Sequence, residues 1–171
     1  MFKHSGIIRR IDDFGRIVIP KEVRRKFRIL DGDPIELCED GENIVLRKYS
    51  AIGLSCESVQ KILSTFSKST SHPVILCSTN SVLNSFRVSV KTPDFLTAKL
   101  CDALHKKEKS YLGYEITDES RLKVKTLAEI SVEGTLEGAL IIPQTSGGCT
   151  VTAEDIACLE LCAKIIGELL I

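Results

Sequence analysis

Tryptophan is absent from this chain, methionine occurs once, and aromatic residues make up 5% of its 171 residues. The formal net charge is zero, because 23 basic side chains balance 23 acidic ones. No apolar run reaches the roughly 18 residues needed to cross a bilayer. The N-terminus has charge at Lys3 but no apolar core followed by a small-residue cleavage site, so we expect the chain to stay in the cytoplasm. The length suits one ordinary domain or two small ones.

The seven cysteines include no C-x-x-C pair, and an odd number makes a poor disulfide framework. We therefore expect buried thiols in a reducing compartment. Cys101 and His105 are four residues apart, as are Cys158 and Cys162, but two ligands do not make a metal site. Cysteines on an apolar helix face are ordinary core residues.

No arrangement of residues points to catalysis. Gly147 and Gly148 lack the lysine and the spacing of a P-loop, and they more simply link a strand to a helix. No grouping of serine, histidine and carboxylate can be argued from spacing. We predict no enzymatic activity, no metal and no cofactor. An unidentified small-molecule ligand is compatible with this prediction.

Charge is divided unevenly along the chain. Residues 3–28 contain nine basic and three acidic side chains, whereas residues 29–50 contain six acidic and two basic ones. The nine basic residues are Lys3, Arg9, Arg10, Arg16, Lys21, Arg24, Arg25, Lys26 and Arg28. Such a local excess is the pattern that phosphate backbones select, so the sequence predicts DNA binding by this segment, nucleoid association and an acidic end that points away from the DNA.

The basic segment has a readable local pattern. A turn is expected at residues 12–15, where Asp12 and Asp13 more simply organise the backbone and orient arginines than bind a metal. Residues 16–19 are rich in β-branched side chains and favour a strand. Pro20 suits the first turn of a helix, which we expect over residues 21–29 with Val23 and Phe27 on its buried side.

A hairpin is expected after this helix. Ile35, Leu37, Ile44 and Leu46 alternate on either side of Asp40-Gly41, which predicts two strands with one apolar face. A block of this size with one short helix cannot bury enough surface to be stable alone. The sequence therefore predicts an obligate homodimer.

Residues 6–50 resemble the AbrB family of bacterial transition-state regulators, with an almost unbroken match through G-I-I-R-R-I-D-D-F-G-R-I-V-I-P-K-E-V-R-R-K-F-R-I and G-D-P-I-E-L. The resemblance implies a swapped-hairpin β-barrel built by two chains, with arginines that grip double-stranded DNA. By position these are Arg9, Arg16, Arg24 and Arg25, with Arg10 and Lys3 as flanking contacts. The alternative is a solvated helix face at Arg24, Arg25 and Arg28, but the basic side chains come from separate elements with few acids nearby, which favours binding.

Residues 51–171 contain twelve basic and fourteen acidic side chains and predict an α/β domain. Helices are expected at about 55–68 and between 93 and 107. Strands are expected at 73–77, near 82–83, and at 111–116, 124–132 and 136–143, with a hairpin turn at 133–135.

The final helix has an unusual distribution of side chains. Thr152 and Asp155 form a capping-box pattern, and beyond them Glu160, Lys164 and Glu168 make one narrow charged stripe. The apolar surplus is expected to contact a second helix, either that of residues 55–68 or a copy in another chain, the alternative being a wholly intramolecular core.

This order of elements resembles a GAF domain. The sequence is thus identified as α+β, with an AbrB-type domain at 1–50, a linker at 51–55 and a GAF-like domain at 56–171. The resemblance of the whole chain to regulators that join an AbrB-type domain to a GAF-like domain implies a homotetramer joined through C-terminal helices and a role in timing gene expression during spore formation. It implies no ligand residues.

Three alternative functions are compatible with these features of the sequence. The first is a transcriptional regulator whose DNA binding is modulated by the GAF-like half. The second is an antitoxin-like protein that binds operator DNA and a toxin, since AbrB-like domains occur in antitoxins. The third is a small-molecule sensor whose basic domain only assembles subunits.

Overall fold

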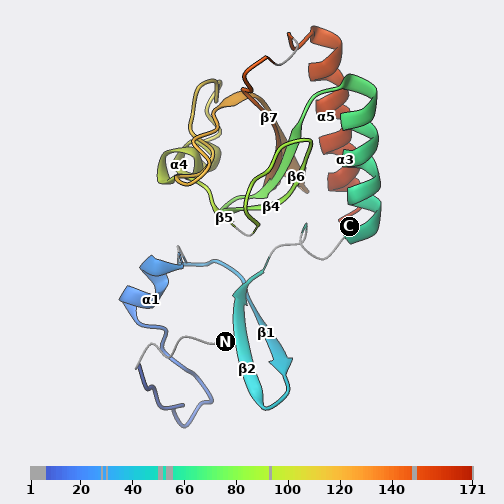
Figure 1. Cartoon of the computed structure of the whole chain (residues 1–171). Coiled ribbons are helices and arrows are strands. Elements are labelled where there is room, and N and C mark those ends of the chain that lie inside the picture. The colour runs from blue at the N-terminus through green and yellow to red at the C-terminus, as the bar shows by residue number, and fades with distance from the viewer. Residues whose placement is uncertain are drawn as a thin grey trace. The chain divides into compact units, whose positions relative to one another are not determined.

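The computed structural model describes residues 7–27, 29, 31–49, 52, 56–92, 94–147 and 150–170. The chain divides into two compact units, Met1–Tyr49 and Ser50–Ile171, which are described separately (Figure 1). Lys3, Arg28, Gly148 and most of the expected linker at 51–55 lie outside the described residues. Within the described residues, no helix is both long enough and apolar enough to span a bilayer.

The first unit contains one short helix and one hairpin. Helix α1 (Lys21–Lys26) begins directly after Pro20 and ends at Phe27, which is shorter than the expected 21–29. Strands β1 (Ile35–Asp40) and β2 (Asn43–Lys48) pair antiparallel, which confirms the predicted hairpin. Gly41 opens the two-residue turn with φ +62°, a conformation that glycine adopts without steric cost.

The strand predicted at residues 16–19 is not formed in the single chain. The backbone N–H of Asp12 donates to the carbonyl of Arg16 and that of Gly15 donates to the carbonyl of Asp12, so the turn at 12–15 is present. Beyond it, no described residue of the same chain pairs with residues 16–19. A strand exists only through hydrogen bonds to a neighbour, so β-branched residues alone do not produce one.

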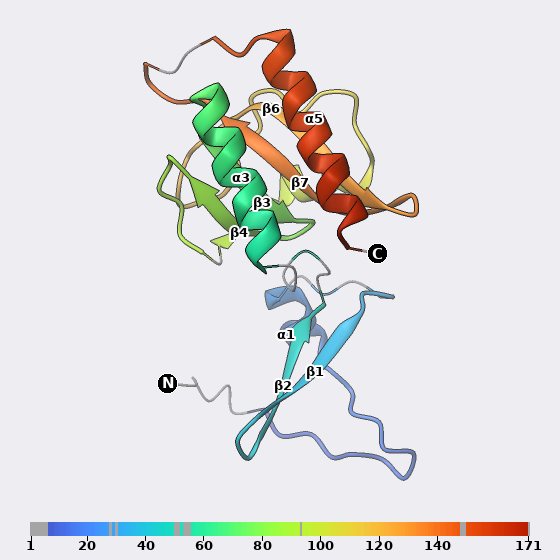
Figure 2. The same cartoon turned by 90° about the vertical axis from the view of Figure 1, so that its right-hand side faces the viewer.

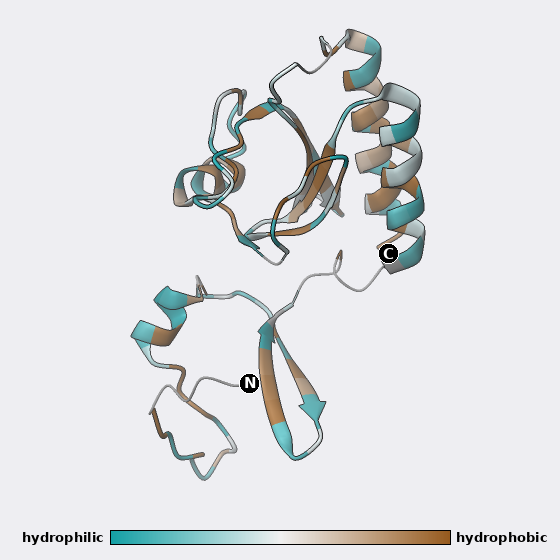
Figure 3. Ribbon diagram, viewed as in Figure 1, coloured by the Kyte–Doolittle hydropathy of each residue, from teal (hydrophilic) through white to brown (hydrophobic). Residues whose placement is uncertain are grey.

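The described residues of the first unit include no buried side chain. Leu37 and Leu46 lie opposite each other on the hairpin and, with Ile44, are exposed; Figure 3 shows the hydrophobic residues of this hairpin in brown. Further exposed apolar residues precede the helix: Ile7, Ile8, Ile11, Phe14, Ile17 and Val18. The described residues of this unit therefore have abundant apolar surface and form no core of their own.

The second unit is built on a five-stranded antiparallel sheet of order β5-β4-β3-β7-β6. The strands are β3 (Val74–Ser78), β4 (Ser81–Phe86), β5 (Asp94–Phe95), β6 (Val124–Val132) and β7 (Thr135–Pro143). The predicted strands at 73–77, 124–132 and 136–143 are confirmed, as is the hairpin turn at Glu133-Gly134. In chain order β3 is the first strand of this sheet and β7 is the last, and the two are neighbours inside it.

The strand predicted at residues 111–116 is wrong. This segment forms only an isolated bridge between Glu115 and Lys123. Gly113 has φ +81°, and the backbone N–H of Tyr114 donates to the carbonyl of Tyr111. The resulting turn interrupts the extended backbone that a strand requires.

Helices cover both faces of this sheet. Helices α3 (Cys56–Thr70) and α5 (Ala153–Glu168) contact each other on one face, and Figure 2 shows them side by side. Helix α4 (Ala98–His105) packs on the opposite face, so the predicted helices at 55–68 and between 93 and 107 are confirmed with shifted ends. Thr152 and Asp155 form both hydrogen bonds of the predicted capping box.

Candidate nucleic-acid interface

The turn that begins at Asp12 is organised by that carboxylate. Asp12 Oδ1 accepts from the backbone N–H groups of Phe14, at 3.0 Å, and Arg16, at 2.8 Å. Its Oδ2 accepts from Nε of Arg16 at 2.9 Å. These bonds confirm that Asp12 organises the turn and orients an arginine. The N–H of Arg16 is the main cause that holds the pKa of Asp12 below its usual value.

The guanidinium group of Arg16 is held by Asp12 at its Nε edge and is exposed at its Nη edge. Its guanidinium carbon lies 4.8 Å from the centroid of the Phe14 ring, and its side chain is 70% exposed. The Asp12 carboxylate accepts a hydrogen bond from Nε, and within the described residues the terminal Nη nitrogens make no hydrogen bond. A guanidinium held this way still presents donors to a phosphate oxygen.

Arg24 has a partner that sequence reasoning missed. Its Nη1 lies 2.5 Å from Oδ1 of Asp31, whose side chain is 94% exposed. An ion pair this exposed contributes little to stability, and a phosphate could replace the carboxylate. Asp31 lies beyond the end of α1, so helical spacing does not place it beside Arg24.

The other predicted contacts are solvent-facing. Arg9, Arg10 and Arg25 are exposed, and Nη1 of Arg9 donates only to the neighbouring carbonyl of Ile8 at 3.3 Å. Lys3 lies outside the described residues. The first unit thus places exposed guanidinium groups before the turn, in the turn and on α1.

The hairpin of the same unit has the opposite charge. Arg47 on β2 donates from Nε to Oε2 of Glu36 on β1 at 2.6 Å, and this bond is the main cause of the lowered pKa of Glu36. Glu39, Asp40 and Glu42 are exposed on the same hairpin. The basic side chains are therefore concentrated outside the hairpin.

The described thiols and other polar groups of the second unit form no cluster comparable to the exposed arginines of the first unit. Cys77 and Cys101 are buried, as predicted, and burial raises the pKa of the Cys77 thiol to about 12. Cys158 and Cys162 are half-buried against the helix-covered core. Among the described residues, no three histidine, cysteine or acidic side chains are grouped as metal ligands would be.

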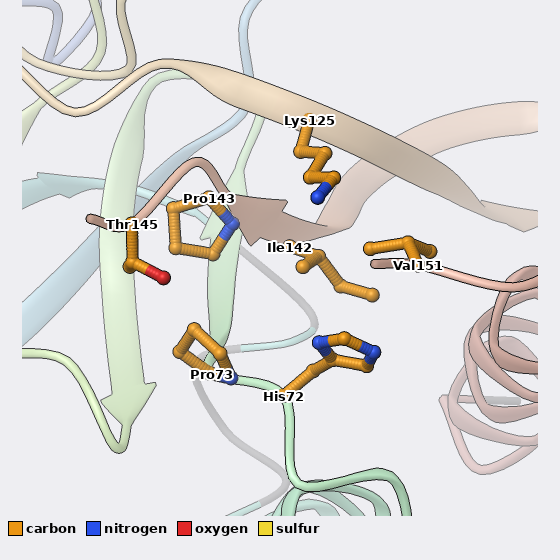
Figure 4. A pocket seen from close by; sticks show the side chains of 7 residues that line it. All are labelled: His72, Pro73, Lys125, Ile142, Pro143, Thr145 and Val151. Carbon is orange, nitrogen blue, oxygen red and sulfur yellow. The ribbon is translucent and has the colours of Figure 1, made fainter. Parts of the chain in front are cut away.

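A small hollow lies at the end of the sheet near the start of α5. Figure 4 shows its lining, which is His72, Pro73, Lys125, Ile142, Pro143, Thr145 and Val151. His72 is buried, and its Nε2 lies 3.1 Å from Oδ2 of Asp155, the same oxygen that accepts from Thr152. This arrangement ties the chain after α3 to the cap of α5.

Comparison with known proteins identifies the first unit. The family described as "Antidote-toxin recognition MazE, bacterial antitoxin" matches residues 8–53. Together with the relatives below, this match shows that the N-terminal part of the chain is a domain of the MazE/AbrB type.

The relatives are named proteins of Bacillus subtilis (strain 168). Stage V sporulation protein T is 46% identical over 77 residues, which are 44% of this chain and 43% of that protein. Transition state regulatory protein AbrB is 42% identical over 55 residues, 32% of this chain and 56% of that protein. Putative transition state regulator Abh is 44% identical over 52 residues, 30% of this chain and 56% of that protein. The chain thus spans about half the length of these relatives.

Proposed function

We propose that this chain is a homo-oligomeric, DNA-binding transcriptional regulator that acts on transition-state or sporulation genes. The observation that supports it best is the exposed set of arginines around a turn fixed by Asp12. Guanidinium groups bind phosphate oxygens through paired hydrogen bonds and also reach guanine edges in the major groove. The named relatives are regulators of the transition state and a sporulation protein.

In this proposal Arg9, Arg16, Arg24 and Arg25 contact DNA directly. Arg10 and Lys3 are flanking contacts. The exposed ion pairs of Arg16 and Arg24 are exchanged for phosphate contacts, at little cost because solvent already screens them.

We infer that two copies of the first unit join as a swapped-hairpin barrel. The support is the lack of a buried side chain among its described residues, together with the exposed faces at Leu37, Ile44 and Leu46. Residues 16–19 would gain the strand partner that a single chain does not supply. The domain boundaries that fit this proposal are 1–50 and 56–171, with a linker at 51–55.

We further propose that the second unit is GAF-like and joins dimers into a tetramer. The two-sided antiparallel sheet, with terminal helices α3 and α5 on one face and α4 on the other, supports the GAF assignment. The support for assembly is on α5 and its C-cap residue, where Leu161, Ile165 and Leu169 remain exposed although the helix already contacts α3. A second copy of this face would cover them.

An antitoxin is the second candidate, and the family name favours it. Against it, the second unit has two buried core clusters, one on each face of its sheet. A segment that folds only on a toxin does not contain such a core.

The test uses the full chain. Gel shifts over a range of salt concentrations and light scattering should give salt-sensitive DNA binding by a dimer or tetramer. A monomer with no salt-sensitive DNA affinity would refute the proposal. Stable capture of a co-expressed toxin, with DNA binding that depends on it, would favour the second candidate.

A further inference from the structure

Phe14 is the aromatic residue at the tip of the basic turn. Phe14 is 81% exposed, the guanidinium of Arg16 stacks over its ring at 4.8 Å, and its backbone N–H donates to Asp12. Gly15 follows with φ +74°. The ring therefore projects from a backbone that is already fixed.

The position of Phe14 differs from that of the exposed apolar residues of the hairpin. Leu37, Ile44 and Leu46 belong to an alternating strand pattern that a second copy of the chain can cover. Phe14 lies in a turn closed by the hydrogen bond from Gly15 to Asp12, which cannot extend into a strand ladder.

The charge around Phe14 favours an anionic occupant. Arg16 lies against the ring, and Arg9 and Arg10 are exposed just before the turn. The same turn of a second copy has the same positive charge and would be repelled. Double-stranded DNA combines negative phosphates with apolar base faces, and it matches both features of this turn.

We propose that the Phe14 ring enters a DNA groove and wedges between neighbouring base pairs while Arg16 contacts the phosphate at the groove edge. Proteins that insert apolar side chains in this way partly unstack a base step and bend the duplex. Pyrimidine–purine steps are the easiest to unstack, so the wedge would favour them without hydrogen bonds to bases. This inference rests on the proposed function.

The fixed turn explains why one ring can be effective. Arg16 stacks on one face of Phe14, and the backbone N–H groups of Phe14 and Arg16 are both bonded to Asp12. Little conformational freedom is then lost when the ring enters the duplex. Arg16 also supplies the phosphate contact that positions the ring.

The test uses full-length protein and a duplex selected by it from a random-sequence pool, with 2-aminopurine placed at successive positions. Binding of the wild type should raise fluorescence at one step, because unstacking relieves quenching. Phe14→Ala should abolish that rise and weaken binding by about 5-fold or more. The salt slope should not change, since no charge is removed.

Phe95→Ala is the matched control, because Phe95 is also a partly exposed phenylalanine but lies on β5 of the second unit. It should retain both the fluorescence rise and the affinity. Light scattering on each variant checks the assembly.

Three results would overturn the inference. They are unchanged affinity of Phe14→Ala, weakened binding that keeps the fluorescence rise, and loss of oligomers in Phe14→Ala, which would make the ring a subunit contact. If the wild type selects no duplex at all, the proposed function fails, whereas an unaffected Phe14→Ala variant refutes only the wedge.

Discussion

Replacing Arg25 by alanine tests the phosphate contacts through their salt dependence. Arg25 is exposed on α1 and makes no salt bridge with any described residue, so its removal leaves no unpaired acid among them. Each phosphate neutralised on duplex DNA contributes about 0.9 to the slope of log affinity against log salt concentration. The proposed homodimer would present this side chain twice, so the slope should flatten by about 1.8. Over a fourfold rise in salt, the affinity advantage of the wild type should then shrink by about 12-fold.

The assay is fluorescence anisotropy with one labelled duplex at several salt concentrations. Arg47→Ala is the charge-matched control, since Arg47 lies on the hairpin and already pairs with Glu36. The control should keep the wild-type slope. If Arg25→Ala also keeps it, or if both variants flatten it equally, the assignment of phosphate contacts to α1 is refuted.

Three further predictions concern the second unit. Leu63→Ala should lower the free energy of unfolding of this unit by about 2–5 kcal/mol in a denaturant titration, because Leu63 is a fully buried residue of α3 in the core between this helix and the sheet, and a loss below 1 kcal/mol would contradict this packing. Gly138→Ala should destabilise by about 1–3 kcal/mol in the same titration, because its Cβ would lie 2.2 Å from the Cys77 carbonyl oxygen; an unchanged midpoint would show that the strands can separate there. Asp155→Asn should lower the melting temperature near neutral pH, with a difference that shrinks as pH falls below 3.8. The N–H of Thr152 lowers the pKa of Asp155 in the folded state, so the stabilisation is present above 3.8 and is lost as the wild-type carboxylate protonates; a pH-independent difference would contradict this cause.

Local chemistry made several elements predictable. The capping box of Thr152 and Asp155 and the turn at Gly41 depend on groups within a few residues of each other, so the sequence contains all that determines them. The strand expected at 111–116 did not form because the positive φ of Gly113 turns the chain, which leaves only an isolated bridge where the sequence pattern predicted a continuous ladder.

For the candidate site, the sequence indicated where basic side chains gather but not every contact that they make. The excess of arginine and the orienting role of Asp12 were readable because a turn and its side-chain cap are local. The bond from Arg24 to Asp31 was not, because it depends on where the chain goes after α1 ends. The stacking of Arg16 on Phe14 was not either, because it depends on the rotamers of both side chains. The strand expected at 16–19 needs a partner that the single chain does not supply.

Hydrogen–deuterium exchange of the full chain, with and without a DNA duplex, tests the central claim most directly. The account predicts that DNA slows exchange in peptides covering residues 7–27, where the exposed arginines lie. It predicts little change in the acidic hairpin of residues 35–48. Protection that falls on the hairpin or on the sheet of the second unit, with residues 7–27 unaffected, would contradict it.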